Sequence, residues 1–164
     1  MSSAQNVLME EKKLKLELRL AQLEKNEKCQ DDFITFVKTV WPDFIAGRHH
    51  RIIAEKLERV ASGELKRLII NMAPRHTKSE FASFLFPAWM MGQNPKMKII
   101  QATHTTELAV NFGRKTKNLI ESDEFKEIFP DVKLAADSKA SGRWDTSKGG
   151  MYYAVGVGSN LAGR

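Results

Sequence analysis

The feature that most constrains this chain is an apolar run followed by a short loop and a Lys-Ser pair. Leu68-Ile69-Ile70 leads into the loop Ala73-Pro-Arg-His-Thr77, and Lys78-Ser79 then opens a helical pattern. This order of strand, loop, Lys-Ser and helix is that of a phosphate-binding P-loop. Backbone N–H groups of such a loop and of the helix start form a positive concavity that favours an anion. The sequence therefore predicts a strand over residues 67–72 and a helix that begins at Lys78 or Ser79.

The match to the general P-loop pattern is incomplete. The pattern Gly-x-x-x-x-Gly-Lys-Ser/Thr has glycines where this chain has Met72 and Thr77. The alternative is a plain strand-to-helix turn, in which Ser79 caps the helix and Lys78 points into solvent. The two cations of the loop, Arg75 and Lys78, favour the phosphate site. In that interpretation Lys78 contacts the β- and γ-phosphates and the Ser79 hydroxyl binds Mg²⁺.

Residues 72–80 resemble the loop Pro-Pro-Arg-His-Gly-Lys-Ser-Glu of tailed-phage terminase large subunits, the DNA-packaging ATPases. Thr77 stands where that family usually has glycine, and a β-branched residue would be strained there if φ is positive. The resemblance covers about residues 31–164, because further matching segments occur in the same order along the chain. These segments are Phe33, Phe36, Trp41-Pro42, His49-His50, Phe86-Pro-Ala-Trp89, Asn94-Pro95, Glu124-Phe-Lys-Glu-Ile-Phe-Pro130, Gly149-Gly150 and Leu161-Ala-Gly-Arg164.

The resemblance implies an α/β fold of the P-loop NTPase type, of the ASCE class, with three α/β/α layers around a mostly parallel sheet. It implies ATP and Mg²⁺ as cofactors, with Ser79 on the metal. Lys78 and Arg75 would act on the phosphates during hydrolysis, and Arg164 would be an arginine finger for a neighbouring subunit. The residues that would bind the nucleotide are Pro74, Arg75, His76, Thr77, Lys78 and Ser79.

The family's motor hydrolyses ATP to move double-stranded DNA into a procapsid. The resemblance therefore implies a portal protein, a small terminase subunit and copies of the chain in a ring as partners, in the host cytoplasm. In the family, the acidic residues that hold Mg²⁺ and orient water follow the Leu-x-Gly-Arg segment, and this sequence has no apolar run ending in paired acids. We expect a charged arm over residues 1–30 and, over residues 31–164, the N-terminal portion of an incomplete ATPase domain. The second acidic motif and the nuclease domain would be absent, as in a split, interrupted or truncated gene, and the chain alone would turn over little ATP.

Two other classes of function remain open from the sequence. One is a helicase-like or other P-loop ATPase that acts on DNA. The other is a non-catalytic nucleotide-binding or assembly module, in which the leucine-rich N-terminal helix does the work. A net charge of +6 and a pI near 9.5 suit a polyanionic partner and do not separate these classes.

The cysteine count and the longest apolar run bear on the cellular compartment of the chain and on membrane insertion. Cys29 is the single cysteine, which excludes an internal disulfide and fits a reducing cytoplasm. The four histidines are too scattered in sequence for a zinc ligand set. The apolar run 81–91 is too short to cross a bilayer, and Pro87 interrupts it, so we expect no membrane partner.

The remaining patterns predict alternating helices and strands. Helices are expected over residues 6–28, 33–41, 46–60, 107–120 and 122–129, and strands over 97–102 and 151–157. The helix over 6–28 would either dock on its own domain or touch a neighbouring subunit. Apolar Ile99 and Ile100 indicate a strand buried on both faces.

Several side chains outside the loop carry two interpretations each. In the resembling family the segment before the first strand helps to hold adenine. The resemblance therefore implies that His49, His50 or Phe44 stacks on the base. The alternative is an ordinary surface or capping role for these side chains. Thr103 is expected to cap the helix that follows it, whereas a DNA contact would come from His104 or Thr105. Trp144 and Tyr152 are expected to pack in the core.

Overall fold

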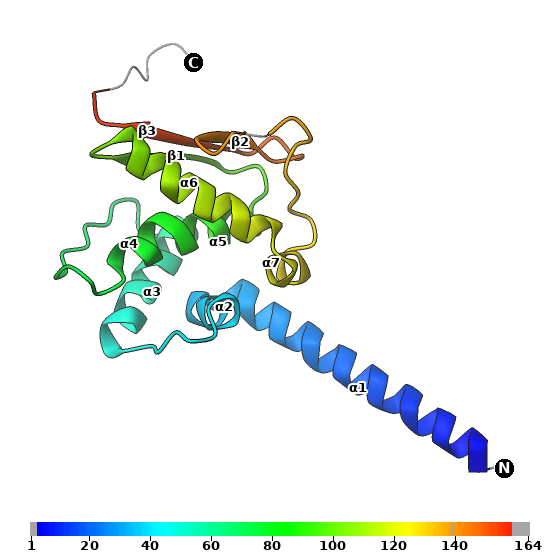
Figure 1. The fold of residues 1–164 in the computed structure, drawn as a ribbon. Coiled ribbons are helices and arrows are strands. Elements are labelled where there is room, and N and C mark those ends of the chain that lie inside the picture. The colour runs from blue at the N-terminus through cyan, green and yellow to red at the C-terminus, as the bar shows by residue number, and fades with distance from the viewer. Residues whose placement is uncertain (1–2, 139, 159–164) are drawn as a thin grey trace.

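A small mixed sheet with helices on one side forms the body of the molecule (Figure 1). The computed structural model describes residues 3–138 and 140–158, and all elements below lie in these ranges. The strands β1 (Lys98–Thr103), β2 (Arg143–Asp145) and β3 (Met151–Gly156) are arranged in the order β1-β3-β2. β1 and β3 are parallel, and β2 is antiparallel to β3. The predicted α/β class and the strands predicted near 97–102 and 151–157 are therefore confirmed.

The helices agree with the sequence patterns to within a few residues. They are α1 (Ser3–Asp31), α2 (Phe33–Val40), α3 (Arg48–Ala61), α4 (Lys78–Glu80), the π-helical segment η1 (Phe81–Leu85), α5 (Phe86–Gln93), α6 (Thr106–Glu121) and α7 (Asp123–Ile128). In η1, the N–H of Phe86 bonds to the carbonyl of Phe81, five residues earlier. Pro87 lacks an N–H and crowds the preceding turn, so a widened turn just before it has a clear cause.

Helix α6 packs against the sheet at a position that only glycine allows. A Cβ on Gly113 would lie 2.5 Å from the carbonyl oxygen of Ser141, closer than real Cβ contacts. The Gly113 carbonyl accepts a hydrogen bond of 3.3 Å from Trp144 Nε1. Trp144 is fully buried and stacks on Tyr152, with ring centroids 4.9 Å apart and nearly parallel planes. Both aromatic residues are therefore core residues, as predicted.

A second set of aromatic contacts joins the helices below the sheet. Phe33 of α2 is fully buried and contacts the rings of Phe81 and Trp89, each at a centroid distance of 5.5 Å. Trp89 Nε1 donates a 2.9 Å hydrogen bond to the carbonyl oxygen of Cys29, so α5 is also tied to the end of α1. This cluster fixes the helical run 78–93, and with it the position of the loop that precedes it.

The strand predicted over residues 67–72 is not formed. Burial alternates along this segment, with Leu68, Ile70 and Met72 half-buried and Ile69 86% exposed, which is the local pattern of a strand. A strand also requires a neighbour that pairs with its backbone, and the described sheet contains β1, β3 and β2 alone. The predicted strand-helix-strand unit from 67–72 to 97–102 is therefore wrong for this structure. The parallel pair is β1 with β3 instead.

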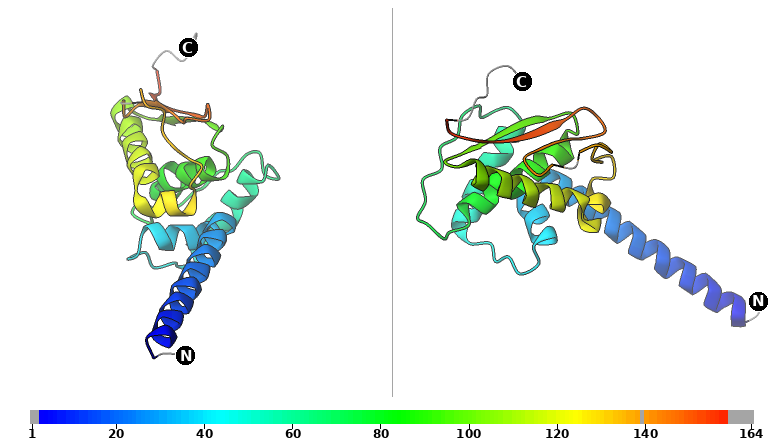
Figure 2. Two further views of the ribbon diagram at one scale, coloured as in Figure 1. Left: turned by 90° about the vertical axis from the view of Figure 1, so that its right-hand side faces the viewer. Right: turned by 45° about the horizontal axis from the view of Figure 1, so that its top comes forward.

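Strand β1 also differs from its prediction, because it is not buried on both faces. Every second residue is exposed, and Ile100 keeps 59% of its surface accessible. Helix α6 covers one face of the sheet, while β1 is an edge strand whose other face meets solvent (Figures 1 and 2). The consecutive apolar residues Ile99 and Ile100 therefore do not imply that both faces of β1 are buried.

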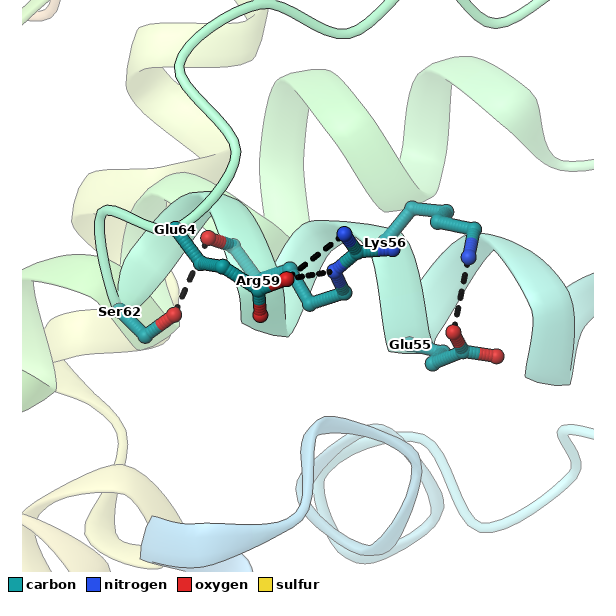
Figure 3. Close-up of polar contacts among 5 residues, drawn as sticks. All are labelled: Glu55, Lys56, Arg59, Ser62 and Glu64. Carbon is teal, nitrogen blue, oxygen red and sulfur yellow. Dashed lines mark hydrogen bonds and ion pairs between the residues drawn. The ribbon is translucent and has the colours of Figure 1, made fainter.

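The C-terminal end of α3 fixes the start of the segment that leads to the loop (Figure 3). Arg59 donates to Glu64 through Nε at 2.9 Å, and its Nη2 lies 2.7 Å from the same carboxylate oxygen. Ser62 Oγ donates to the Arg59 carbonyl at 3.1 Å. Gly63 follows with φ of 79°, a left-handed conformation that glycine adopts without strain. The end of the helix predicted over residues 46–60 is confirmed to within one residue.

Helix α1 projects from the body (Figures 1 and 2). Its C-terminal part is anchored, since Asn26 Nδ2 donates to the Glu127 carbonyl at 2.8 Å and Cys29 is fully buried. Residues 5–21 are exposed. Within the described ranges, no helix combines the length and the apolar character needed to cross a membrane.

Candidate functional site

Residues 73–80 form an open concavity of about 510 Å³ at the end of the molecule where β1 and β3 reach their carboxyl ends (Figure 1). Two residues of the loop have left-handed backbone conformations, Arg75 with φ of 64° and Thr77 with φ of 59°. His76 between them has no positive φ, and such an alternation of backbone conformations in a turn can direct N–H groups toward one side and form an anion-binding concavity. The conformation of Thr77 is the one expected if this position replaces a glycine, and it is strained for a β-branched residue.

The helix that begins after the loop starts without a side-chain cap. Thr77 occupies the N-cap position, and its carbonyl accepts the first intrahelical hydrogen bond, from the Phe81 N–H at 2.9 Å. Among the described residues, no side chain caps this helix start. The N–H groups of Lys78, Ser79 and Glu80 have no acceptor inside the helix because they lie in its first turn. The alternative in which Ser79 is the cap is therefore wrong.

The side chains of the predicted site residues lie around this opening. Lys78 is half-buried, and its Nζ lies 3.4 Å from the Met72 carbonyl, so it crosses back over the loop instead of extending into solvent. Ser79 is exposed on the first turn. The exposed residues Pro74, Arg75 and His76 form the outer loop, where His76 Nδ1 donates to the Pro74 carbonyl at 2.9 Å. Arg164, the predicted arginine finger, lies outside the described residues.

Thr77 is held by His50 of α3. His50 Nδ1 accepts a 3.0 Å hydrogen bond from the Gly47 N–H, so the neutral ring carries its proton on Nε2. Nε2 then donates to Thr77 Oγ1 at 2.6 Å, and Thr77 Oγ1 donates to the His76 carbonyl at 2.7 Å. Burial, followed by the charges of His49 and His76, lowers the pKa of His50 below its ordinary value of 6.5. A neutral His50 is what this hydrogen-bond chain requires.

The link between His50 and Thr77 corrects one sequence interpretation. His50 and Phe44 were candidates for stacking on adenine, yet both are buried and contact each other, with ring centroids 4.7 Å apart. His49 is only half-buried and lines a hollow of about 260 Å³ between α3 and residues 68–72. Of the three candidates, His49 is therefore the one placed to touch a ligand beside the loop.

The described residues offer few acidic groups near this site. Glu80 is the carboxylate closest in sequence to Ser79, and it pairs with Lys115 Nζ of α6 at 2.8 Å. No group of three or more His, Cys, Asp or Glu residues within the described ranges could hold a metal ion. Binding of Mg²⁺ by the Ser79 hydroxyl, which would need phosphate oxygens and water as the other ligands, stays a prediction.

A second hollow, also of about 510 Å³, lies at the start of α6. Thr105 caps this helix by accepting from the Leu108 N–H at 3.2 Å, whereas Thr103 Oγ1 donates to the Thr105 carbonyl. The prediction of Thr103 as the cap is therefore wrong by two residues. His104 is exposed beside it, with Arg114 lining the hollow. A DNA contact from this loop stays a prediction.

Comparison of the chain with protein-family models, with characterised proteins and with solved structures gave no match. The interpretation of the loop therefore depends on its own geometry. Sequence reasoning missed the left-handed Arg75, because arginine has no special tendency toward that conformation. It also missed the structural role of His50, which only the packing of α3 against the loop creates.

Proposed function

We propose that this chain is the ATP-binding part of a phage terminase large subunit, the motor that hydrolyses ATP to translocate double-stranded DNA into a procapsid. The observation that carries the proposal is the uncapped helix start at Lys78, which follows the left-handed residues Arg75 and Thr77 and is spanned by the Lys78 side chain. A helix start of this kind, with a lysine over it, suits a polyphosphate better than a neutral ligand.

Each residue of the loop has a role that follows from its place. The N–H groups of Lys78, Ser79 and Glu80 would donate to phosphate oxygens at the helix start. The Lys78 ammonium would exchange the Met72 carbonyl, at 3.4 Å, for the stronger charge-assisted contact with a phosphate. Arg75, exposed on the outer loop, would reach the terminal phosphate. Mg²⁺ bound with the nucleotide would neutralise phosphate charge, and Ser79 would hold it.

The finer fold proposed here is an ASCE-type P-loop NTPase with a three-layer arrangement. The alternating burial of residues 68–72 supports it, because that segment would be the strand leading into the loop. It would become a strand on gaining a paired neighbour, which the described residues do not provide. The proposed partners are double-stranded DNA, a portal protein, a small terminase subunit and further copies of the chain in a ring, all in the host cytoplasm.

The test is the binding of Mg-ATP to the purified chain, measured by titration calorimetry. We expect Lys78→Ala to weaken binding about 10- to 100-fold, which is the worth of one charge-assisted contact with phosphate. Lys96→Ala is the matched control, because Lys96 is exposed on the turn before β1 and lies outside the loop. Equal affinities of the two variants would refute the phosphate site.

A second measurement addresses the metal. Ser79→Ala should reduce the gain in ATP affinity that Mg²⁺ gives, while affinity without the metal stays close to that of the unchanged chain. We expect turnover by this chain to be low, because Glu80, the nearest carboxylate in sequence, is paired with Lys115. Rapid hydrolysis that Lys78→Ala abolishes would contradict this expectation and would place a catalytic carboxylate within the chain.

A further inference from the structure

The exposed part of α1 carries more apolar surface than a solvated helix requires. Leu16, Leu20 and Leu23 keep 71%, 56% and 45% of their surface exposed, and Met9 keeps 62%. Contacts that anchor α1 come from Gln22 onward, where Gln22, Asn26 and Gln30 reach α7. Most of the stability of a helix in a protein comes from packing of its apolar face, so the exposed apolar side chains of α1 indicate a partner.

These apolar residues follow a seven-residue repeat. In the notation abcdefg, Met9, Leu16 and Leu23 occupy d positions, and Leu20 occupies the a position between the last two. Lys13 takes the preceding a position, and a single lysine there is tolerated in two-stranded coiled coils at some cost in stability. The a and d positions of residues 9–24 therefore form one stripe about 24 Å long.

The charges beside this stripe are sorted by sign. The e positions are Glu10, Glu17 and Glu24, all acidic, and the g positions are Lys12 and Arg19, both basic. All five side chains are exposed. One edge of the stripe is thus acidic and the other basic along its whole length. A helix face that only meets solvent does not require its charges to be separated by sign in this way.

Charge order of this kind selects both the partner and its direction. In a parallel pair of identical helices, each g position faces the e position of the following repeat on the other helix. Lys12 would then face Glu17 of the second copy, and Arg19 would face Glu24. An antiparallel pair would bring e to e and g to g, so glutamates would meet glutamates and cations would meet cations. We propose that α1 forms a parallel two-stranded coiled coil with the same helix of a second copy of this chain.

A second apolar stripe on α1 serves as an internal comparison. Val7, Leu14 and Leu18 are also exposed, at 54%, 58% and 63%. The repeat through these residues has Glu11 and Lys25 at core positions, as the first repeat has Lys13 and Glu27, so core charges do not separate the two stripes. The second stripe has glutamates at all its g positions and Leu8, Lys15 and Gln22 at its e positions, so its edges are not sorted into matching opposite charges. The first stripe is therefore the pairing surface. Anchoring contacts from Gln22, Asn26 and Cys29 use c and g positions, which leaves its a and d positions over residues 9–23 open.

The first test is the mass of the full chain in solution, by sedimentation equilibrium over a range of concentrations. We expect a reversible dimer, converted to monomer by the double substitution Leu16→Ser with Leu20→Ser. The matched control is Leu14→Ser with Leu18→Ser, which has the same spacing on the other stripe and should remain dimeric. A chain that is monomeric at about 1 mM, an oligomer that the Leu16→Ser and Leu20→Ser double variant leaves intact, or equal effects of the two double variants would overturn the proposal.

The second test addresses the direction of pairing. Glu17→Lys with Glu24→Lys should weaken the dimer about tenfold or more, and so should Lys12→Glu with Arg19→Glu, because each puts like charges in contact. Mixing the two variants should restore pairing. In an antiparallel dimer, Glu17→Lys with Glu24→Lys would only replace one like-charge contact by another, so undiminished pairing would refute the parallel direction.

Cross-linking gives an independent measure of direction. A parallel pair brings Met9 beside Met9 of the second copy, so Met9→Cys should form a disulfide-linked dimer under mild oxidation. Val7→Cys, on the other stripe, is the control and should link poorly. Cys29 is fully buried and does not compete. Efficient linking of a mixture of Met9→Cys and Leu20→Cys chains, without linking of Met9→Cys alone, would show an antiparallel pair and refute the proposal.

Discussion

Two threonines stand at the starts of two helices in this molecule, and they behave in opposite ways. Thr105 has an extended backbone, with φ of −121°, and its side chain accepts from the Leu108 N–H. Thr77 has a left-handed backbone, with φ of 59°, and its side chain turns away from its helix to His50. Thr105 therefore uses its hydroxyl to close a helix start, and Thr77 leaves one open.

The difference teaches that the residue type at a helix start does not decide whether the start is available to a ligand. Threonine is a good cap when its backbone is extended. At Thr77 the left-handed backbone and the His50 hydrogen bond remove the hydroxyl from that role. The strain of this conformation, about 1–3 kcal/mol, is held by the contacts around it. Such strain occurs where a site is prepared for a ligand, which is consistent with the proposed phosphate site.

Among variants at the two helix starts, the largest expected loss of stability comes from removing His50, the hydrogen-bond partner of Thr77. His50→Ala would delete a buried ring that packs on Phe44 and Phe81 and would leave Thr77 without its partner. We expect a loss of about 2–4 kcal/mol in the free energy of unfolding, measured by chemical denaturation. His104→Ala, at an exposed position on the loop before α6, should change the free energy by less than about 0.5 kcal/mol. Equal losses would mean that His50 does not support the loop.

Substitutions of Thr77 should separate strain from hydrogen bonding. Thr77→Val keeps the branched side chain and loses the hydroxyl, so we expect a loss of about 1–2 kcal/mol in unfolding free energy. Thr77→Gly also loses the hydroxyl, yet it removes a left-handed strain of about 1–2 kcal/mol and should be close to neutral. A glycine variant less stable than the valine variant would contradict the observed backbone conformation.

A smaller effect is expected at the closed helix start. Thr105→Val removes the cap of α6 and should cost about 1 kcal/mol in unfolding free energy. It should leave the affinity for Mg-ATP unchanged, whereas Thr77→Val should weaken it, because only the second change disturbs the loop. Calorimetric titration of both variants checks this. Loss of ATP binding in Thr105→Val would place the nucleotide at the hollow beside α6 instead.

The smallest expected effect is the contribution of His50 to the pH dependence of stability. Because the pKa of His50 in the folded chain lies below 6.5, the unfolded chain takes up more protons near that pH. Stability should therefore be full above about pH 6.5 and decrease as the pH falls below it. His50→Gln should flatten this dependence in denaturation curves recorded between pH 5 and 8, and His104→Gln should not. A slope of opposite sign would show that His50 is stabilised in its charged form.

Prediction from sequence succeeded where local patterns decide the structure. The helix periodicities, the apolar strand at 151–157 and the helix end near residue 60 were all found. Thr77, where the sequence indicated strain if φ is positive, does have a positive φ. Prediction failed at residues 67–72, because a strand is a relation between two segments and this one has no paired neighbour. It failed again at Ile100, since burial depends on which face a helix covers.

The sequence by itself determined the positions of the helices and of strands β1 and β3, the cationic loop with its Lys-Ser pair, and the sorted charges of α1, because these follow from spacing along the chain. Only the tertiary structure decided that Thr77 would turn its hydroxyl to His50, that Lys78 would cross back to the Met72 carbonyl, and that the α1 leucines would stay exposed. These outcomes depend on contacts between segments far apart in the chain, and spacing within one segment carries no information about them.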